Sequence, residues 1–272
     1  MKYLVGLVVC LILVASVAVA SAAPVGNIAI PSKGMLKKGM AVGDVEDSQF
    51  SLVISPEMDF IFNRKLESRI GKNEFNFYGA KIGATVANKG LVYFLLGGGD
   101  VKQEFTISGQ AVKYDTNSAF IWGAGGTVVV WEYEPFVASM DEHMLRIGVD
   151  ARYRRIELDV EELTVDGAAY MKTGTTSVLT SATYEANEWQ IAPALSYQFN
   201  NFVPYIGVKY SDIDGDAKAL VSGTEYKQDL KADGNIGVFG GIDIVMGNFV
   251  SINIEGRMID EEALTLSANA RF

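Results

Sequence analysis

The stretch 236-IGVFGGIDIV-245 decides the fold, because Ile236, Val238, Ile242 and Ile244 share one parity along it. The same alternation returns in 250-VSINIEGR-257 and in 264-LTLSANARF-272. Successive side chains of a β-strand point to opposite faces, so each stretch makes one apolar face and one more polar face. The short breaks between them predict tight turns. The three stretches are therefore predicted to form an antiparallel meander that ends on an aromatic residue of the apolar face.

This alternation fits two environments. In a soluble sandwich, the apolar face packs on a second sheet and the polar face meets water. In a membrane barrel, the apolar face meets lipid and the polar face lines the lumen. The rest of the chain has to decide between them.

The first 22 residues have the pattern of a secretory signal peptide. Lys2 supplies a positive charge, residues 4–14 form an apolar core, and Ala20-Ser21-Ala22 precede the predicted cut. An uncleaved membrane anchor is the alternative, although small residues dominate the end of the segment. We predict a signal peptide at 1–22, an irregular periplasmic arm at 23–48 and a barrel domain at 49–272.

Composition excludes some classes of partner. The 272-residue chain has a formal net charge of −10, and loss of Lys2 with the signal peptide makes this −11. Nucleic acid requires a basic surface, so we expect no nucleic-acid partner. The single cysteine, Cys10, lies inside the predicted signal peptide, which leaves the mature chain without a thiol.

Seven further stretches alternate like the C-terminal meander, and their connections differ in length. They lie at residues 50–62, 74–87, 91–107, 119–133, 143–160, 189–199 and 202–210. With the meander this predicts about ten strands, with eight or twelve as alternatives.

Short turns are predicted at 88–90, 200–201 and 246–248, and long polar loops at 161–187 and 211–234. Short periplasmic turns and longer extracellular loops are typical of outer-membrane barrels. We therefore predict an all-β fold, a closed antiparallel transmembrane β-barrel.

Aromatic residues at strand ends support the membrane interpretation. Residues 189–199 rise by about 25 Å at a tilt of about 40°, which matches the apolar band of an outer-membrane barrel. Trp189 and Phe199 would then lie at the two rims. The predicted aromatic girdle consists of Trp131, Tyr133, Trp189, Phe199, Phe202, Tyr210, Phe249 and Phe272.

The parity of the apolar residues changes inside the stretch 143–160. Leu145, Ile147 and Val149 share one face, whereas Ile156 and Leu158 fall on the other. One extra residue near 154–155 would explain the change. A strand that leaves the membrane for water would explain it equally well.

Charged residues on the polar parity are predicted to line the lumen. They are Lys81, Arg146, Asp150, Arg152, Lys209, Asp243, Glu255, Arg257 and Arg271. Buried charges are costly unless they are paired, so a narrow lumen predicts ion pairs, whereas a wide lumen would leave them hydrated. About eight strands enclose a filled interior and about 16 a wide channel. Ten strands therefore favour a narrow or closed lumen.

These features together resemble the bacterial outer-membrane β-barrel proteins of the small opacity and porin-like kind. The resemblance covers residues 50–272 and rests on the signal peptide, the alternating strands, the turns and the terminal stretch. It implies residence in the bacterial outer membrane and contact with its lipid. It also implies that Leu264, Leu266 and Phe272 are read by the barrel assembly machinery. It implies no substrate.

Candidate catalytic and metal sites are weak in this sequence. The one histidine, His143, is predicted at the periplasmic rim, away from the outer rim where barrel enzymes keep a catalytic histidine. The acidic stretch 212–216 lacks the spacing of a calcium loop and is predicted to be a hydrated loop. We predict no catalytic, metal or cofactor-binding residues. The expected role is structural or a surface interaction with an unidentified extracellular ligand, and a small passive channel is the alternative.

Overall fold

The computed structural model describes residues 50–64, 73–86, 89–107, 110–116, 119–133, 143–171, 179–221, 224–246 and 250–272. The predicted signal peptide at 1–22 and arm at 23–48 lie outside the described residues. Within the described part of the chain, no helix has the length and hydropathy of a membrane span.

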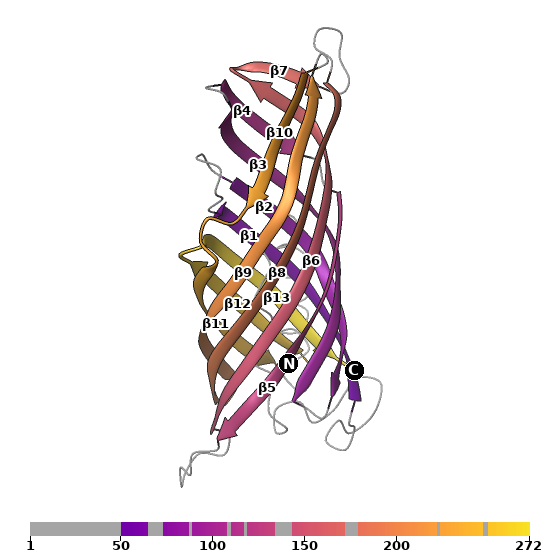
Figure 1. Cartoon of the computed structure of the whole chain (residues 1–272). Helices are drawn as coiled ribbons and strands as arrows, with labels where there is room; N and C mark the ends of the chain where they lie inside the picture. The colour runs from indigo at the N-terminus through magenta and orange to yellow at the C-terminus, as the bar shows by residue number, and fades with distance from the viewer. Residues whose placement is uncertain are drawn as a thin grey trace.

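The described residues form one sheet of 13 strands (Figure 1). Their bounds are β1 (Phe50–Arg64), β2 (Asn73–Val86), β3 (Gly90–Ile107), β4 (Gln110–Thr116), β5 (Ala119–Tyr133), β6 (His143–Val165), β7 (Ala168–Met171), β8 (Leu179–Phe199), β9 (Phe202–Val221), β10 (Thr224–Lys231), β11 (Ile236–Met246), β12 (Val250–Met258) and β13 (Glu261–Arg271).

Ten of these strands close into a barrel. The ring runs β1-β2-β3-β5-β6-β8-β9-β11-β12-β13 and returns to β1, and every neighbouring pair is antiparallel. The closing pair is tied at the C-terminus, where Leu52 and Phe272 exchange backbone hydrogen bonds of 3.1 and 2.9 Å. Closure satisfies the backbone groups that an edge strand would leave unpaired in lipid. The predicted all-β, ten-strand closed barrel is confirmed.

The two ends of the barrel differ. At one end, which we call the turn end, Val86 pairs with Gly90 and Phe199 pairs with Phe202 across short connections. The other end is the extension, made of β4, β7 and β10 with the adjoining ends of β3, β6, β8 and β9. In Figure 1 the extension rises well above β11, β12 and β13, so the wall is tall on one side and low on the other.

The extension corrects the two long loops predicted at 161–187 and 211–234. β6 continues to Val165, where Asp166 and Gly167 turn the chain with φ of 48° and 83°. β8 begins at Leu179, and β9 pairs with β10 along its upper part. The prediction of loops was wrong because these strands alternate polar residues with small ones such as alanine, which give little apolar signal.

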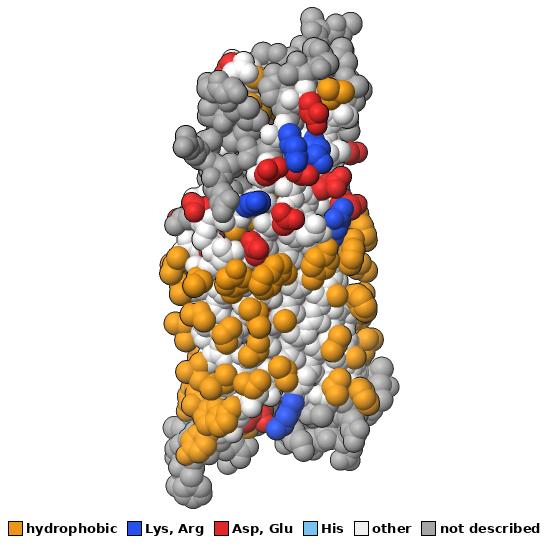
Figure 2. All heavy atoms as spheres, in the orientation of Figure 1, with side chains coloured by type: hydrophobic (Ala, Val, Ile, Leu, Met, Phe, Trp, Pro, Cys, Tyr) orange, Lys and Arg blue, Asp and Glu red, His pale blue; other side chains and the backbone are white. Residues whose placement is uncertain are grey.

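Side-chain polarity inverts between the barrel and the extension. Around the barrel the outer face is apolar, with Ile206 66% exposed and Phe94 64% exposed. Figure 2 shows this band of hydrophobic side chains with charged side chains above it. Inside the extension the side chains are apolar and buried, and Val101, Val112, Val160, Leu163 and Leu230 belong to one hydrophobic cluster.

This inversion explains the change of parity in β6. β6 pairs with β8 in one continuous register from His143↔Phe199 to Asp159↔Thr183. An extra residue near 154–155 is therefore wrong. The strand instead passes from lipid to water, and the face that must be apolar changes from the outside to the inside.

Because of this inversion, the free-energy cost of a charge on the outer face depends on its height along the barrel axis. We expect Ile206→Arg, on the outer face of the barrel, to lower the free energy of unfolding by about 2–4 kcal/mol, the cost of Arg near the bilayer midplane. The matched variant Ser181→Arg lies on the exposed outer face of β8 in the extension and should change it little. Urea unfolding in lipid vesicles measures both. Equal losses in the two variants would contradict the inversion.

Candidate functional site in the barrel interior

All nine charged residues predicted to line the lumen are buried inside the barrel. Their exposed fractions lie between 0 and 6%. They do not form one cluster. Lys209 and Arg257 lie toward the extension, whereas the others line the middle and lower lumen, with Arg271 near the turn end. Residues that the sequence reasoning missed connect the upper group.

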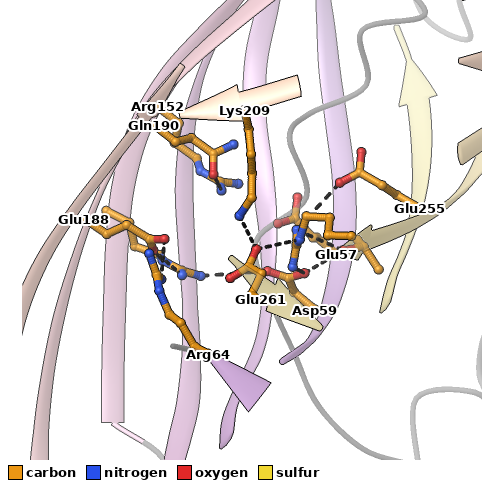
Figure 3. A network of polar contacts seen from close by, with 12 residues as sticks. Glu57, Asp59, Arg64, Arg152, Glu188, Gln190, Lys209, Glu255 and Glu261 are labelled. Atoms are coloured by element: carbon orange, nitrogen blue, oxygen red, sulfur yellow. Dashed lines mark hydrogen bonds and ion pairs between the residues drawn. The ribbon is translucent and has the colours of Figure 1, made fainter. Parts of the chain in front are cut away.

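Glu188 is the centre of one half of the upper group. Its carboxylate accepts from Arg64 Nη1 at 2.6 Å and from Arg154 Nε at 2.9 Å, with a second contact to Arg154 Nη2. Figure 3 shows Arg64 and Glu188 pointing toward one another from opposite parts of the wall. One carboxylate thus joins β1, β6 and β8 across the lumen.

Arg257 is the centre of the other half. It donates from Nη2 to Asp59 at 3.0 Å, and its Nε lies 2.8 Å from Glu261 Oε1. Lys209 pairs with Glu261 and, at 2.8 Å, with Asp260. These contacts join β1, β9, β12 and β13, and Figure 3 shows Lys209 reaching down toward Glu261.

The turn between β12 and β13 supplies two of these acids. Ile259 has a φ of 88°, which a β-branched residue rarely adopts. Asp260 and Glu261 follow it, and both side chains are buried. The turn therefore directs two carboxylates into the lumen, where they cover Lys209.

The two halves meet, because Arg154 Nη1 lies 3.8 Å from Asp59 Oδ2. We call the eight residues the ion-pair layer: Asp59, Arg64, Arg154, Glu188, Lys209, Arg257, Asp260 and Glu261. Four cations face four anions, so their formal charges balance. Arg154 and Glu188 are sequence neighbours of the lipid-facing Tyr153 and Trp189. The layer thus crosses the lumen at the upper aromatic rim.

Above the ion-pair layer, apolar side chains fill the interior of the extension, while on the low side of the wall an open cavity lined by Phe62, Met258 and Ile259 reaches Arg257 and Glu261. The guanidinium of Arg154 lies 4.8 Å from the centre of the Phe75 ring, which begins the apolar cluster. Burial raises the pKa of Tyr184, inside the extension, to about 12. Burial acts in that direction because it penalises the charged phenolate.

Below the layer, the lumen is lined by smaller polar networks. Asp150 accepts from Tyr93 at 3.1 Å and from Thr127 at 2.8 Å, and Arg152 donates to Gln190 at 2.9 Å. Lys81 pairs with Glu57 at 2.8 Å. Near the turn end, Arg271 donates to Ser51 at 2.6 Å and to Thr85 at 2.9 Å. Each of these charges is compensated by nearby polar groups.

The predicted aromatic girdle falls at two heights of the outer face. Trp189 packs against Tyr210 with ring centres 5.1 Å apart and tilted planes, and Phe199 lies 5.7 Å from Phe202 at the turn end. Trp131 and Tyr133 are exposed and stack at 6.0 Å. Phe272 is partly exposed at the end of β13, and Phe249 lies outside the described residues. Leu264 and Leu266, predicted as part of an assembly signal, lie on the outer face of β13.

The two weak candidate sites, His143 and the acidic stretch 212–216, make contacts with neighbouring strands. His143 Nδ1 lies 2.6 Å from the hydroxyl of Tyr197. The acidic stretch 212–216 is not a loop but part of β9, where Asp216 pairs with Lys218 and Lys227 at 2.9 Å each. Hydrogen bonds from Lys227 and then Lys218 lower the pKa of Asp216 to about 2. Among the described residues, no three His, Cys, Asp or Glu side chains are grouped to hold a metal ion.

Part of the ion-pair layer could have been found from the sequence. Asp59 shares the polar parity of the first strand, and Arg154 continues the parity of Arg152. Arg64, Glu188 and Glu261 were missed because they lie just beyond the predicted strand ends. The sequence signal for these residues is an alternation that continues past the aromatic rim. It can be recognised only if the predicted strands are extended beyond the membrane.

A closed ten-strand barrel with an apolar outer band and a polar lumen defines the outer-membrane β-barrel proteins, and the chain belongs to this class. Short turns of such barrels face the periplasm, so the extension stands on the outer side of the membrane.

Comparison with known proteins supports this class and its location in the outer membrane. The family model described as Chlamydia major outer membrane protein matches residues 158–224, which include much of the extension. The chain is 24% identical over 212 residues to the major outer membrane porin, serovar L3, of Chlamydia trachomatis, a match that covers 59% of this chain and 53% of that protein.

A second relative gives a shorter and more similar match. A major outer membrane porin of Chlamydia pneumoniae is 29% identical over 132 residues, covering 41% of this chain and 32% of that protein. The chain thus spans about half or less of the length of the curated relatives that it matches. Among solved structures, the Escherichia coli outer membrane protease OmpT matches with a TM-score of 0.39 and 9% identity, over 82% of this chain and 92% of that chain.

Removal of one charge from the ion-pair layer should be costly. We expect Glu188→Gln to lower the free energy of unfolding by about 3–5 kcal/mol, because Arg64 and Arg154 would stay buried without their shared anion. The control Glu157→Gln removes an exposed partner of Arg155 and should cost less than about 1 kcal/mol. Urea unfolding in vesicles compares them, and a loss no larger than the control's would show that the layer is hydrated.

Proposed function

We propose that the protein is a closed outer-membrane barrel that presents the extension at the cell surface and does not conduct ions at rest. The observation that carries this proposal is the ion-pair layer under the apolar cluster. A hydrated ion crossing the barrel would have to separate Glu188 from Arg64 and Arg154 and then enter a dry interior. Both steps are costly, because buried charges lose their hydration.

The surface role is supported by the construction of the extension. Its apolar interior holds the strands together without lipid, and its outer face is polar. Arg155 pairs with Glu157 at 2.6 Å, and Lys227 pairs with Asp229 at 3.1 Å on this face. A rigid, solvated scaffold of this kind suits presentation of its tips to an extracellular ligand, whose chemistry these side chains do not define.

Two further interactions belong to this proposal. The apolar band would contact outer-membrane lipid. Leu264, Leu266 and Phe272 would serve as the signal read by the barrel assembly machinery, since they lie on the outer face or end of the last strand.

Absence of enzymatic activity is also part of the proposal. His143 lies at the start of β6, at the turn end, and its ring contacts the ring and hydroxyl of Tyr197. The curated relatives are named as porins rather than as enzymes.

A passive channel is the second candidate, and the names of the curated relatives favour it. In this alternative, the lower lumen would admit ions, and Lys81, Arg152 and Glu255 would set their selectivity. The ion-pair layer would then have to open.

Planar-bilayer recording separates the two candidates. We expect purified, refolded protein to give no steady conductance steps, because the ion-pair layer crosses the lumen. Insertion is verified by flotation of vesicles from the same preparation, and a known porin at the same protein-to-lipid ratio is the positive control. Reproducible open steps whose current scales with voltage would refute the closed barrel and support the channel.

A further inference from the structure

Asp243 stands apart from the other acids of the lumen. Its side chain is fully buried, and neither carboxylate oxygen has a hydrogen-bond partner. Asp150, a comparably buried acid, accepts from Tyr93 and Thr127. An isolated buried carboxylate is costly, so Asp243 must either carry a proton or have a compensating cation.

The neighbours of Asp243 offer oxygen atoms. Asn253 is directly opposite it in the β11–β12 pair. The hydroxyl of Tyr205 lies 2.8 Å from Asn253 Nδ2 and 3.2 Å from Asn253 Oδ1, and it donates to Glu255 Oε2 at 3.0 Å. The assignment of the two ends of the Asn253 amide is interchangeable, so its oxygen can face Asp243.

Gly241 allows this arrangement. It pairs with Tyr205 on one side and with Glu255 on the other. A Cβ atom at residue 241 would lie 2.4 Å from the Tyr205 hydroxyl oxygen. The glycine therefore lets the tyrosine cross β11 and bring its hydroxyl to the β12 acid.

The cations of the described lumen are engaged elsewhere. Arg257 pairs with Asp59 and Glu261, and its Nη1 lies 3.6 Å from Glu255 Oε1. Lys81 pairs with Glu57. Glu255 thus has a guanidinium beside it, shared with two acids of the ion-pair layer, whereas none of the ion pairs among the described residues reaches Asp243.

We propose that Asp243, Asn253, Tyr205 and Glu255 form a binding site for a monovalent alkali cation, with Na⁺ as the fitting ion. Carboxylate, amide and hydroxyl oxygens are ligands for hard cations. A monovalent ion neutralises the carboxylate of Asp243, while Arg257 stays beside Glu255.

A small cavity on the turn-end side of the site is lined by both polar and apolar side chains, including Lys81. Ser267 is the neighbour of Asn253 in β13, and it lines this cavity with Ser55 and Asn269. Ser251, one inward position below Asn253, pairs with Asn269. The site lies below the ion-pair layer, so it does not require an open barrel.

Thermal unfolding in matched salts tests the proposal. We expect the unfolding midpoint of the wild-type protein in detergent to be higher in NaCl than in N-methyl-D-glucamine chloride at equal ionic strength, because a ligand that binds the folded state raises its stability. Asp243→Asn should remove this difference. Asp150→Asn, a buried acid with its own donors, should keep it.

Two outcomes would overturn the site. Equal wild-type midpoints in the two salts would mean that no Na⁺ is bound and that Asp243 carries a proton. A larger rise with CaCl₂ than with NaCl at equal ionic strength would contradict the monovalent assignment. Neither outcome depends on conductance, so this test is separate from that of the closed lumen.

Discussion

The structure depends on the height at which hydrocarbon gives way to water. A strand in lipid needs an apolar outer face, whereas a strand in water needs an apolar inner face. β6 meets both demands without a break in its register with β8, with Ile147 facing outward and Leu158 facing inward. The barrel and the extension are therefore one continuous sheet with two opposite side-chain patterns.

The ion-pair layer lies where these two patterns meet. Polar side chains that fill the lumen below cannot border the apolar interior above unless their charges are compensated. Arg154 contacts both sides of this boundary, since it pairs with Glu188 and lies over the Phe75 ring. The ion-pair layer thus lies between the polar lower lumen and the apolar interior of the extension. This arrangement is the basis of the proposal of a closed barrel. The lower lumen keeps small polar side chains and, in Asp243, one carboxylate without a donor.

Local alternation predicted the ring strands well, because a residue such as Ile206 must face lipid and its neighbours must not. It failed in the extension, where Ala182 and Ala186 point inward and give too little apolar signal to distinguish a strand from a loop. It also could not pair the charges. Asp59 and Arg257 are 198 residues apart, and they meet only because the last strand closes on the first. Contacts of this kind follow from ring closure and register, which no local pattern contains.

The inversion of polarity can be measured most directly by fluorescence quenching in vesicles. Single cysteines that replace Ile191, Thr183 or Ala192 would carry an environment-sensitive dye, in a chain whose own Cys10 is replaced by serine. Brominated lipid should quench the dye at residue 191, a water-soluble quencher should act at residue 183, and the inward residue 192 should respond weakly to both. Quenching of the dye at residue 183 by brominated lipid would contradict the account, because it would place the extension in the membrane.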